Sequence, residues 1–140
     1  MELSLSELKE FAKQFVKELP QTLGSRAHLV GLKGELGAGK TTFVQEVARE
    51  LGIAESVTSP TFVIAKSYQL THPVFRKLVH VDAYRLSLGD PDTIGFGGYL
   101  REPTNLMLVE WPEHLQSFPG DAALMTFHVT GEETRAITHA

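Results

Sequence analysis

The most constraining feature of this 140-residue sequence is a glycine-rich octapeptide, Gly34 to Thr41 (GELGAGKT), which fits G-x-x-x-x-G-K-[ST] at every position. Glycines let the backbone fold into a concave nest of N–H groups that can hold a phosphate chain. The lysine supplies a positive charge for the terminal phosphates, and the next hydroxyl is placed to bind Mg²⁺. The motif therefore predicts a site for a nucleoside triphosphate with magnesium.

The segments around this motif have the patterns of the strand and helix that a phosphate loop requires. Residues 27–32 (AHLVGL) form a short apolar run, typical of a buried strand. From Lys40 to Leu51 the apolar side chains recur on one helical face, and Gly52 ends the pattern. The positive end of this helix dipole would add to the attraction for phosphate.

The rest of the chain predicts one more helix and several strands. Ser4 to Leu19 has apolar residues at helical spacing, and Ser4 with Glu7 has the spacing of a capping box. We expect a loop with at most a short helix over 88–98. We expect strands over 61–70, 77–84 and 105–111, and a closing hairpin over 122–130 and 135–138. This order predicts an α/β fold of the P-loop NTPase type, with three layers and a mixed sheet, in a single domain, 1–140.

Charge and composition limit the class of protein. The chain has 13 basic and 17 acidic residues, a formal net charge of −4, and lacks the basic cluster of a protein that grips nucleic acid by itself. Any role with nucleic acid should therefore run through a partner. Cysteine is absent, which excludes a disulfide scaffold and a thiolate zinc site. We see no secretory signal and no apolar run long enough to span a bilayer, so we expect a cytoplasmic protein.

Two apolar segments end in a carboxylate that can serve the magnesium beside a phosphate loop. They are Leu78 to Asp82 (LVHVD) and Leu106 to Glu110 (LMLVE). An acid at the end of a strand next to the loop strand commonly holds this metal, directly or through water. We rank Glu110 first as the metal partner of Thr41, because four apolar residues precede it without interruption. Asp82 is then the candidate that positions water or magnesium.

Further motifs follow the phosphate loop in a fixed order. They are Thr58 to Phe62 (TSPTF), Tyr68, His80 to Leu86 (HVDAYRL) and Val109 to Glu113 (VEWPE). In this combination they resemble the TsaE (YjeE) family, over about residues 34–113. One departure is the segment 87–98, which is richer in glycine than the acidic, helical stretch often found there in the family. That difference bears on partner affinity or loop order more than on nucleotide binding.

The resemblance implies a small ATPase of the bacterial cytoplasm that is needed for threonylcarbamoyl modification of tRNA, on the adenosine 3′ of the anticodon. It implies that the TsaD protein, in complex with TsaB, carries out the transfer. The ATPase would bind this pair and hydrolyse ATP to ADP to keep it cycling. It would meet tRNA only through the complex, and it would not meet a membrane.

The resemblance also implies a set of site residues. Mg²⁺ is assigned to Thr41 and Glu110, and Asp82 lies near the γ-phosphate. The residues implied to bind ATP are Glu35, Leu36, Gly37, Ala38, Gly39, Lys40, Thr41 and Thr42.

Three residues are expected to be catalytic, namely Lys40, Asp82 and Thr61. Asp82 is our candidate to activate or orient the attacking water. Thr61 fits a switch residue that senses the γ-phosphate, and residues 58–62 then behave as a switch loop. The alternative for Thr61 is an extended turn, since Pro60 disfavours helix in the residue before it.

For four other residues the sequence leaves two interpretations. Trp111 either lies against the nucleotide or a partner, or fills the core. His80 fits a satisfied core histidine better than a catalytic one, and Tyr84 fits a structural role. Arg135 fits a solvated hairpin arginine better than a residue near the nucleotide.

Two other functions are compatible with a phosphate loop. A small-molecule or nucleotide kinase brings several arginines to the transferred phosphoryl group, whereas the six arginines here are scattered and form no lid segment. A GTP switch is suggested by Asp92 to Gly95 (DTIG), which fits D-x-x-G, but the sequence has no N-K-x-D motif to read guanine. We therefore favour the ATPase.

Overall fold

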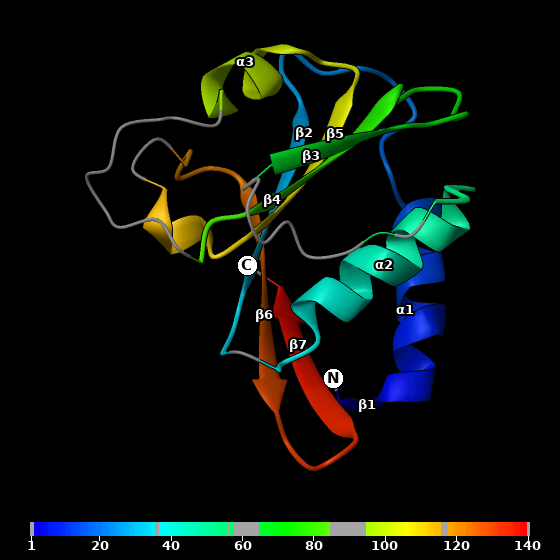
Figure 1. Cartoon of the computed structure of the whole chain (residues 1–140), viewed down its shortest axis with the longest axis vertical. Coiled ribbons are helices and arrows are strands. Elements are labelled where there is room, and N and C mark those ends of the chain that lie inside the picture. Colours follow the sequence, from blue (N-terminus) through cyan, green and yellow to red (C-terminus); the bar gives the residue numbers. More distant parts are fainter. Residues whose placement is uncertain are drawn as a thin grey trace.

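A mixed sheet of seven strands forms the centre of this computed structural model, which describes residues 2–35, 37–55, 57, 65–84, 95–115 and 118–139 (Figure 1). The strands are β1 (Glu2–Ser4), β2 (His28–Lys33), β3 (Ala65–Gln69), β4 (Lys77–Asp82), β5 (Asn105–Glu110), β6 (Ala123–Val129) and β7 (Thr134–His139). Their order is β1-β7-β6-β2-β5-β4-β3. The central strands β6, β2, β5 and β4 are parallel, and the outer strands β7, β1 and β3 are antiparallel to their neighbours.

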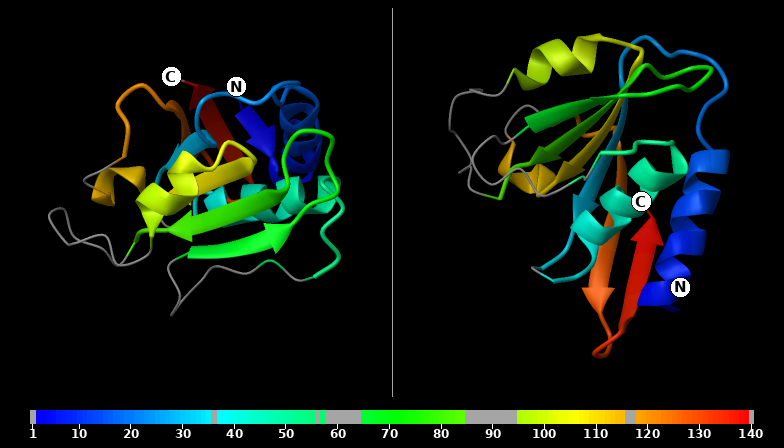
Figure 2. Two further views of the ribbon diagram at one scale, coloured as in Figure 1. Left: turned by 90° about the horizontal axis from the view of Figure 1, so that it is seen from above. Right: turned by 45° about the vertical axis from the view of Figure 1, so that its right-hand side comes forward.

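Helices cover both faces of this sheet. They are α1 (Leu5–Lys17), α2 (Lys40–Glu50) and α3 (Phe96–Arg101), together with a short 3-10 helix, η1 (Pro112–His114). Helices α1 and α2 lie side by side on one face, and α3 lies away from them (Figures 1 and 2). The strands alternate accordingly: Leu78 and Leu108 belong to the core under α1 and α2, and Val79 and Met107 to the core with α3. The predicted three-layer α/β fold with a mixed sheet is confirmed.

Helix α1 begins with the capping box that the sequence predicts. The Ser4 hydroxyl accepts from the Glu7 N–H at 3.2 Å, and the Glu7 carboxylate accepts from the Ser4 N–H at 3.0 Å. These hydrogen bonds lower the pKa of Glu7. Leu8 and Ala12 are buried against the sheet, and Phe15 packs edge-on against Phe43 of α2. The helix ends at Lys17, two residues before the predicted end.

Several boundaries differ from the expectation. Strand β1 is not predicted, because three residues are too few to show a pattern; its pairing with β7 defines it. Helix α3 begins within the expected loop and continues to Arg101, since Phe96 is fully buried and anchors it. Trp111 is not part of β5, because its φ of 60° takes the chain out of the extended region. Residues 61–64 of the predicted strand 61–70 lie outside the described residues.

Among the described residues, no helix combines the length and the apolar content needed to cross a membrane.

Candidate nucleotide site

The phosphate-loop motif connects β2 to α2, as its sequence context predicts. Its glycines Gly34, Gly37 and Gly39 have φ values of 144°, 80° and 100°, which L side chains rarely adopt. At Gly34 a Cβ would also lie only 2.5 Å from the Phe127 carbonyl oxygen. Helix α2 begins at Lys40, and the first N–H groups of a helix have no intrahelical partner. The loop and the helix start therefore present backbone donors that an anion can use.

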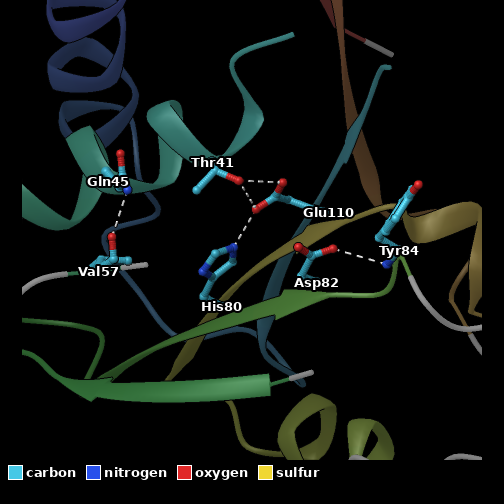
Figure 3. A network of polar contacts seen from close by, with 7 residues as sticks. All are labelled: Thr41, Gln45, Val57, His80, Asp82, Tyr84 and Glu110. Atoms are coloured by element: carbon cyan, nitrogen blue, oxygen red, sulfur yellow. Dashed lines mark hydrogen bonds and ion pairs between the residues drawn. The ribbon is translucent and has the colours of Figure 1, made fainter. Parts of the chain in front are cut away.

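Thr41 and Glu110 meet at the end of β5. Thr41 lies in the first turn of α2, and its hydroxyl is 2.9 Å from both carboxylate oxygens of Glu110 (Figure 3). Glu110 is the last residue of β5 and is only 3% exposed. The two residues that the sequence assigns to magnesium are thus brought together, with three oxygen atoms in one place.

His80 lies behind this carboxylate. Its Nε2 is 2.6 Å from Glu110 Oε2, and its side chain is fully buried (Figure 3). Its Nδ1 has no hydrogen-bond partner among the residues that the structure describes. His80 is buried, as expected, and its Nε2 contacts the site carboxylate, which links it to the site.

Asp82 ends β4 beside Glu110. The two are paired in register across the parallel strands β4 and β5, so their side chains leave the same face of the sheet. Asp82 Oδ1 accepts from the Tyr84 N–H at 3.1 Å (Figure 3). The structure therefore brings together both carboxylates that the sequence singles out. Of the two, Glu110 is the one that contacts the Thr41 hydroxyl.

The ammonium group of Lys40 is buried at the mouth of the loop. It donates to the carbonyl oxygen of Gly34, and its Nζ lies 3.7 Å from the centre of the Trp111 ring. Lys40 is only 4% exposed, and this burial lowers its pKa, against the opposing effect of Glu110 and Glu113. The buried ammonium of Lys40 is thus surrounded by the Gly34 carbonyl oxygen, the Trp111 ring and the nearby carboxylates, close to the Thr41–Glu110 pair.

Trp111 follows Glu110 and turns back over the site. It adopts the left-handed conformation and its ring stacks on His114, at 5.2 Å between centroids, and packs against Tyr84 at the same distance. The ring is half-buried. Of the two interpretations left open by the sequence, the structure favours the site, because the ring contacts the phosphate-loop lysine. Tyr84 is 46% exposed beside it.

Comparison with known proteins decides the family. The TsaE family model, described as threonylcarbamoyl adenosine biosynthesis protein TsaE, matches residues 3–137.

The chain belongs to the TsaE family.

Curated relatives agree with this assignment. A TsaE protein of Synechocystis is 35% identical over 125 residues, which cover 85% of this chain and 74% of the relative. A TsaE protein of Bacillus subtilis is 32% identical over 124 residues, covering 88% and 75%. The crystal structure of Bacillus subtilis YdiB superposes with a TM-score of 0.70 at 27% identity, covering 99% of this chain and 83% of the other. The family resemblance predicted from the motifs is confirmed, and with it a role in tRNA threonylcarbamoyladenosine biosynthesis.

The donor atoms of this TsaE-family site fit magnesium with a triphosphate. Mg²⁺ prefers oxygen ligands and is usually held by one or two carboxylates, completed by phosphates and water. Thr41 and Glu110 supply a hydroxyl and a carboxylate at the loop. Lys40 places a positive charge at the same loop. Among the described residues, no group of three or more His, Asp or Glu side chains forms a metal site on its own.

The sequence favours a solvated hairpin arginine at position 135 over a residue near the nucleotide. Arg135 is half-buried, and it also contacts the phosphate loop, donating from Nε and Nη2 to the carbonyl oxygen of Gly37 at 3.2 and 3.1 Å. The contact links residues far apart in the sequence, so no local pattern marks it. Gln45 is also missed: its Nε2 donates to the Val57 carbonyl at 2.9 Å. Gln45 lies one helical turn after Thr41, which is the signal that its side chain faces the same side of α2.

The other predicted residues divide into two groups. Of the loop, Ala38 is buried, and Gly37 and Thr42 are exposed. Leu36 and Thr61 lie outside the described residues, as does the rest of the expected switch loop, residues 58–62. Their roles stay predictions.

Proposed function

We propose that this TsaE-family protein is an ATPase that supports threonylcarbamoyl modification of tRNA by binding a TsaB–TsaD pair and hydrolysing ATP. The observation that supports ATP hydrolysis most directly is the contact of Thr41 with both oxygens of Glu110, next to the buried ammonium of Lys40. A loop that bound only phosphate would not need a buried carboxylate, because a negative charge beside the phosphates weakens their binding unless a cation lies between them.

Residues 35–42 are the proposed ATP-binding residues. The backbone N–H groups of the loop and of the first turn of α2 bind phosphate oxygens. Lys40 exchanges its hydrogen bond with Gly34 for the β- and γ-phosphates. Because its ammonium is already desolvated, this exchange needs little further loss of hydration.

Thr41 and Glu110 are the proposed residues for magnesium. Their hydroxyl and carboxylate oxygens already lie within hydrogen-bond distance of each other, so a small separation opens a position between them. When bound, Mg²⁺ neutralises charge on the phosphates during transfer. His80 holds the carboxylate from the other side.

Asp82 is the proposed orienter of the attacking water. It is in register with Glu110, and the Tyr84 N–H fixes one of its oxygens. A carboxylate in that position accepts a hydrogen bond from water and can take its proton as the oxygen attacks the γ-phosphorus and the bond to ADP breaks. Thr61 is the proposed γ-phosphate sensor.

Binding to TsaB and TsaD is proposed from family membership. The chain has a net charge of −4, which favours contact with tRNA through the complex and not by this chain alone. A cytoplasmic location follows from that role.

The test is ATP hydrolysis with Mg²⁺, measured for this chain alone and with a TsaB–TsaD pair. We expect weak activity alone and a clear rise with the pair. Strong activity that the pair leaves unchanged would contradict the proposed partners and keep the nucleotide site. Transfer of phosphate to a nucleoside or nucleotide, with no release of inorganic phosphate, would favour a kinase.

A further inference from the structure

The phosphate loop lies against the β6–β7 hairpin, which continues beyond the end of β2. Strand β2 pairs with β6 as far as Lys33 and Thr126, so residues 127–129 extend past it. The loop begins in contact with this extension, because a Cβ on Gly34 would lie 2.5 Å from the Phe127 carbonyl oxygen. Figure 1 shows the end of β2 and the start of α2 beside the hairpin.

One cross-strand pair of the hairpin, Val129 and Arg135, contacts the loop on both sides of residue 36. The Val129 N–H donates to Glu35 Oε1 at 3.1 Å. Arg135 donates from Nε and Nη2 to the Gly37 carbonyl oxygen at 3.2 and 3.1 Å. One cross-strand pair of the hairpin therefore contacts the phosphate loop at two places, Glu35 and Gly37.

The guanidinium of Arg135 is itself fixed by the hairpin turn. Its Nη1 donates to the carbonyl oxygens of Gly131 and Thr134, at 3.1 and 2.7 Å. The planar guanidinium fork thus connects three carbonyl oxygens, two in the turn and one in the loop. Lysine has one nitrogen and cannot reproduce this arrangement.

The geometry points to Arg135 as a positioning residue that holds the phosphate loop ready for nucleotide. A phosphate-binding nest needs its N–H groups toward the anion and its carbonyl oxygens away from it. Gly37 has a φ of 80° and can rotate easily, and Arg135 binds its carbonyl oxygen on the hairpin side. We assign Arg135 a positioning role, because the contacts that the structure gives it are with backbone carbonyl oxygens of the loop and the turn. This inference rests on the proposed function, since it takes the loop to bind ATP.

The test measures nucleotide affinity of the full chain by calorimetry, for the wild type, Arg135→Ala, Arg135→Lys and a control, Arg49→Ala. Arg49 is an exposed arginine of α2 that pairs with Glu46 away from the loop. We expect binding of ATP about tenfold weaker for Arg135→Ala and a smaller loss for Arg135→Lys. Arg49→Ala should bind as the wild type does. We also expect faster hydrogen exchange of the Gly37–Thr41 amides in nucleotide-free Arg135→Ala, and a raised KM for ATP with kcat nearly unchanged.

The outcomes are distinct. Equal affinity in the wild type and both Arg135 variants overturns the inference, and so does a fall in kcat at unchanged affinity. If Arg135→Ala does not fold, Arg135→Lys decides, because its long stem keeps the apolar contacts of the arginine. If the wild type does not bind ATP, the proposed function itself is overturned. The results for the variants test only the role of Arg135.

Discussion

The hydroxyl of Thr41 lies 2.9 Å from both carboxylate oxygens of Glu110, a residue on a different element 69 positions later in the sequence. Helix α2 supplies the hydroxyl in its first turn, and β5 delivers the carboxylate at its end, next to β2 in the sheet. We propose above that this pair holds the cation of a bound nucleotide. Its chemistry leads to the first prediction.

Replacing Glu110 by glutamine should lower ATP hydrolysis by about 100-fold, because it removes the charge and one of the two oxygens that face Thr41. ATP binding measured with a metal chelator should become tighter, because without a cation the Glu110 charge opposes the binding of the phosphates. Glu102→Gln is the control, since this exposed acid precedes the opposite end of β5. Hydrolysis at the wild-type rate in Glu110→Gln would rule out its role with magnesium.

Replacing Asp82 by asparagine should lower kcat by about 100-fold and leave KM for ATP within about threefold. The asparagine side chain keeps an oxygen for the Tyr84 N–H, so the local fold is retained. Steady-state kinetics with Mg²⁺ measure both constants. Normal turnover would show that Asp82 does not act on the attacking water.

Replacing Lys40 by methionine should abolish ATP binding and stabilise the nucleotide-free protein by about 1 kcal/mol. Burial lowers the pKa of Lys40, so its charged form is less favourable in the fold than in the unfolded chain. Methionine keeps the contact with the Trp111 ring without the buried charge.

Chemical denaturation gives the free energy of unfolding for this comparison. Lys66→Met is the matched control, because Lys66 also lies over an aromatic ring, that of Tyr68, but is exposed. Its stability should change by less than about 0.5 kcal/mol. A loss of stability in Lys40→Met would show that the charge contributes to folding without nucleotide.

Replacing His80 by alanine should lower the free energy of unfolding by about 3 kcal/mol. The change leaves a cavity in the core and removes the partner 2.6 Å from the Glu110 carboxylate. His128→Ala on the exposed side of β6 should have little effect. A stable His80→Ala protein with wild-type affinity for Mg²⁺ and ATP would show that His80 neither supports the core nor positions Glu110.

The contact of Glu35 with the hairpin should depend on pH. The Val129 N–H, followed by the backbone of Glu35 itself, lowers the pKa of this carboxyl below its ordinary value of 4.5. The folded protein therefore binds this proton less readily than the unfolded chain does. The contact stabilises the loop above about pH 4.5 and is lost as the pH falls through the lowered pKa.

The Val129 amide signal in an NMR titration reports this event. It should shift with a midpoint below 4.5 in the wild type and should show no such step in Glu35→Gln. A midpoint at or above 4.5 would mean that the hydrogen bond is not maintained in solution.

The features that could be predicted from the sequence are those that depend on local patterns. GELGAGKT contains the loop glycines, the lysine and the hydroxyl within one short segment, and the family motifs identify TsaE. The alternation of β4 and β5 and the capping box at Ser4 follow the periods of strand and helix, so the fold class was predictable. Each of these signals is contained within a few neighbouring residues.

Contacts between residues far apart in the sequence could be found only from the folded chain. The sheet order and register bring Glu110 to Thr41, place Asp82 beside it and put His80 against the same carboxylate. They also bring Arg135 to Gly37, 98 residues away, which the sequence interpretation missed. The physical reason is that a local pattern fixes the face on which a side chain lies, whereas the distance between two such faces depends on how the whole sheet is paired.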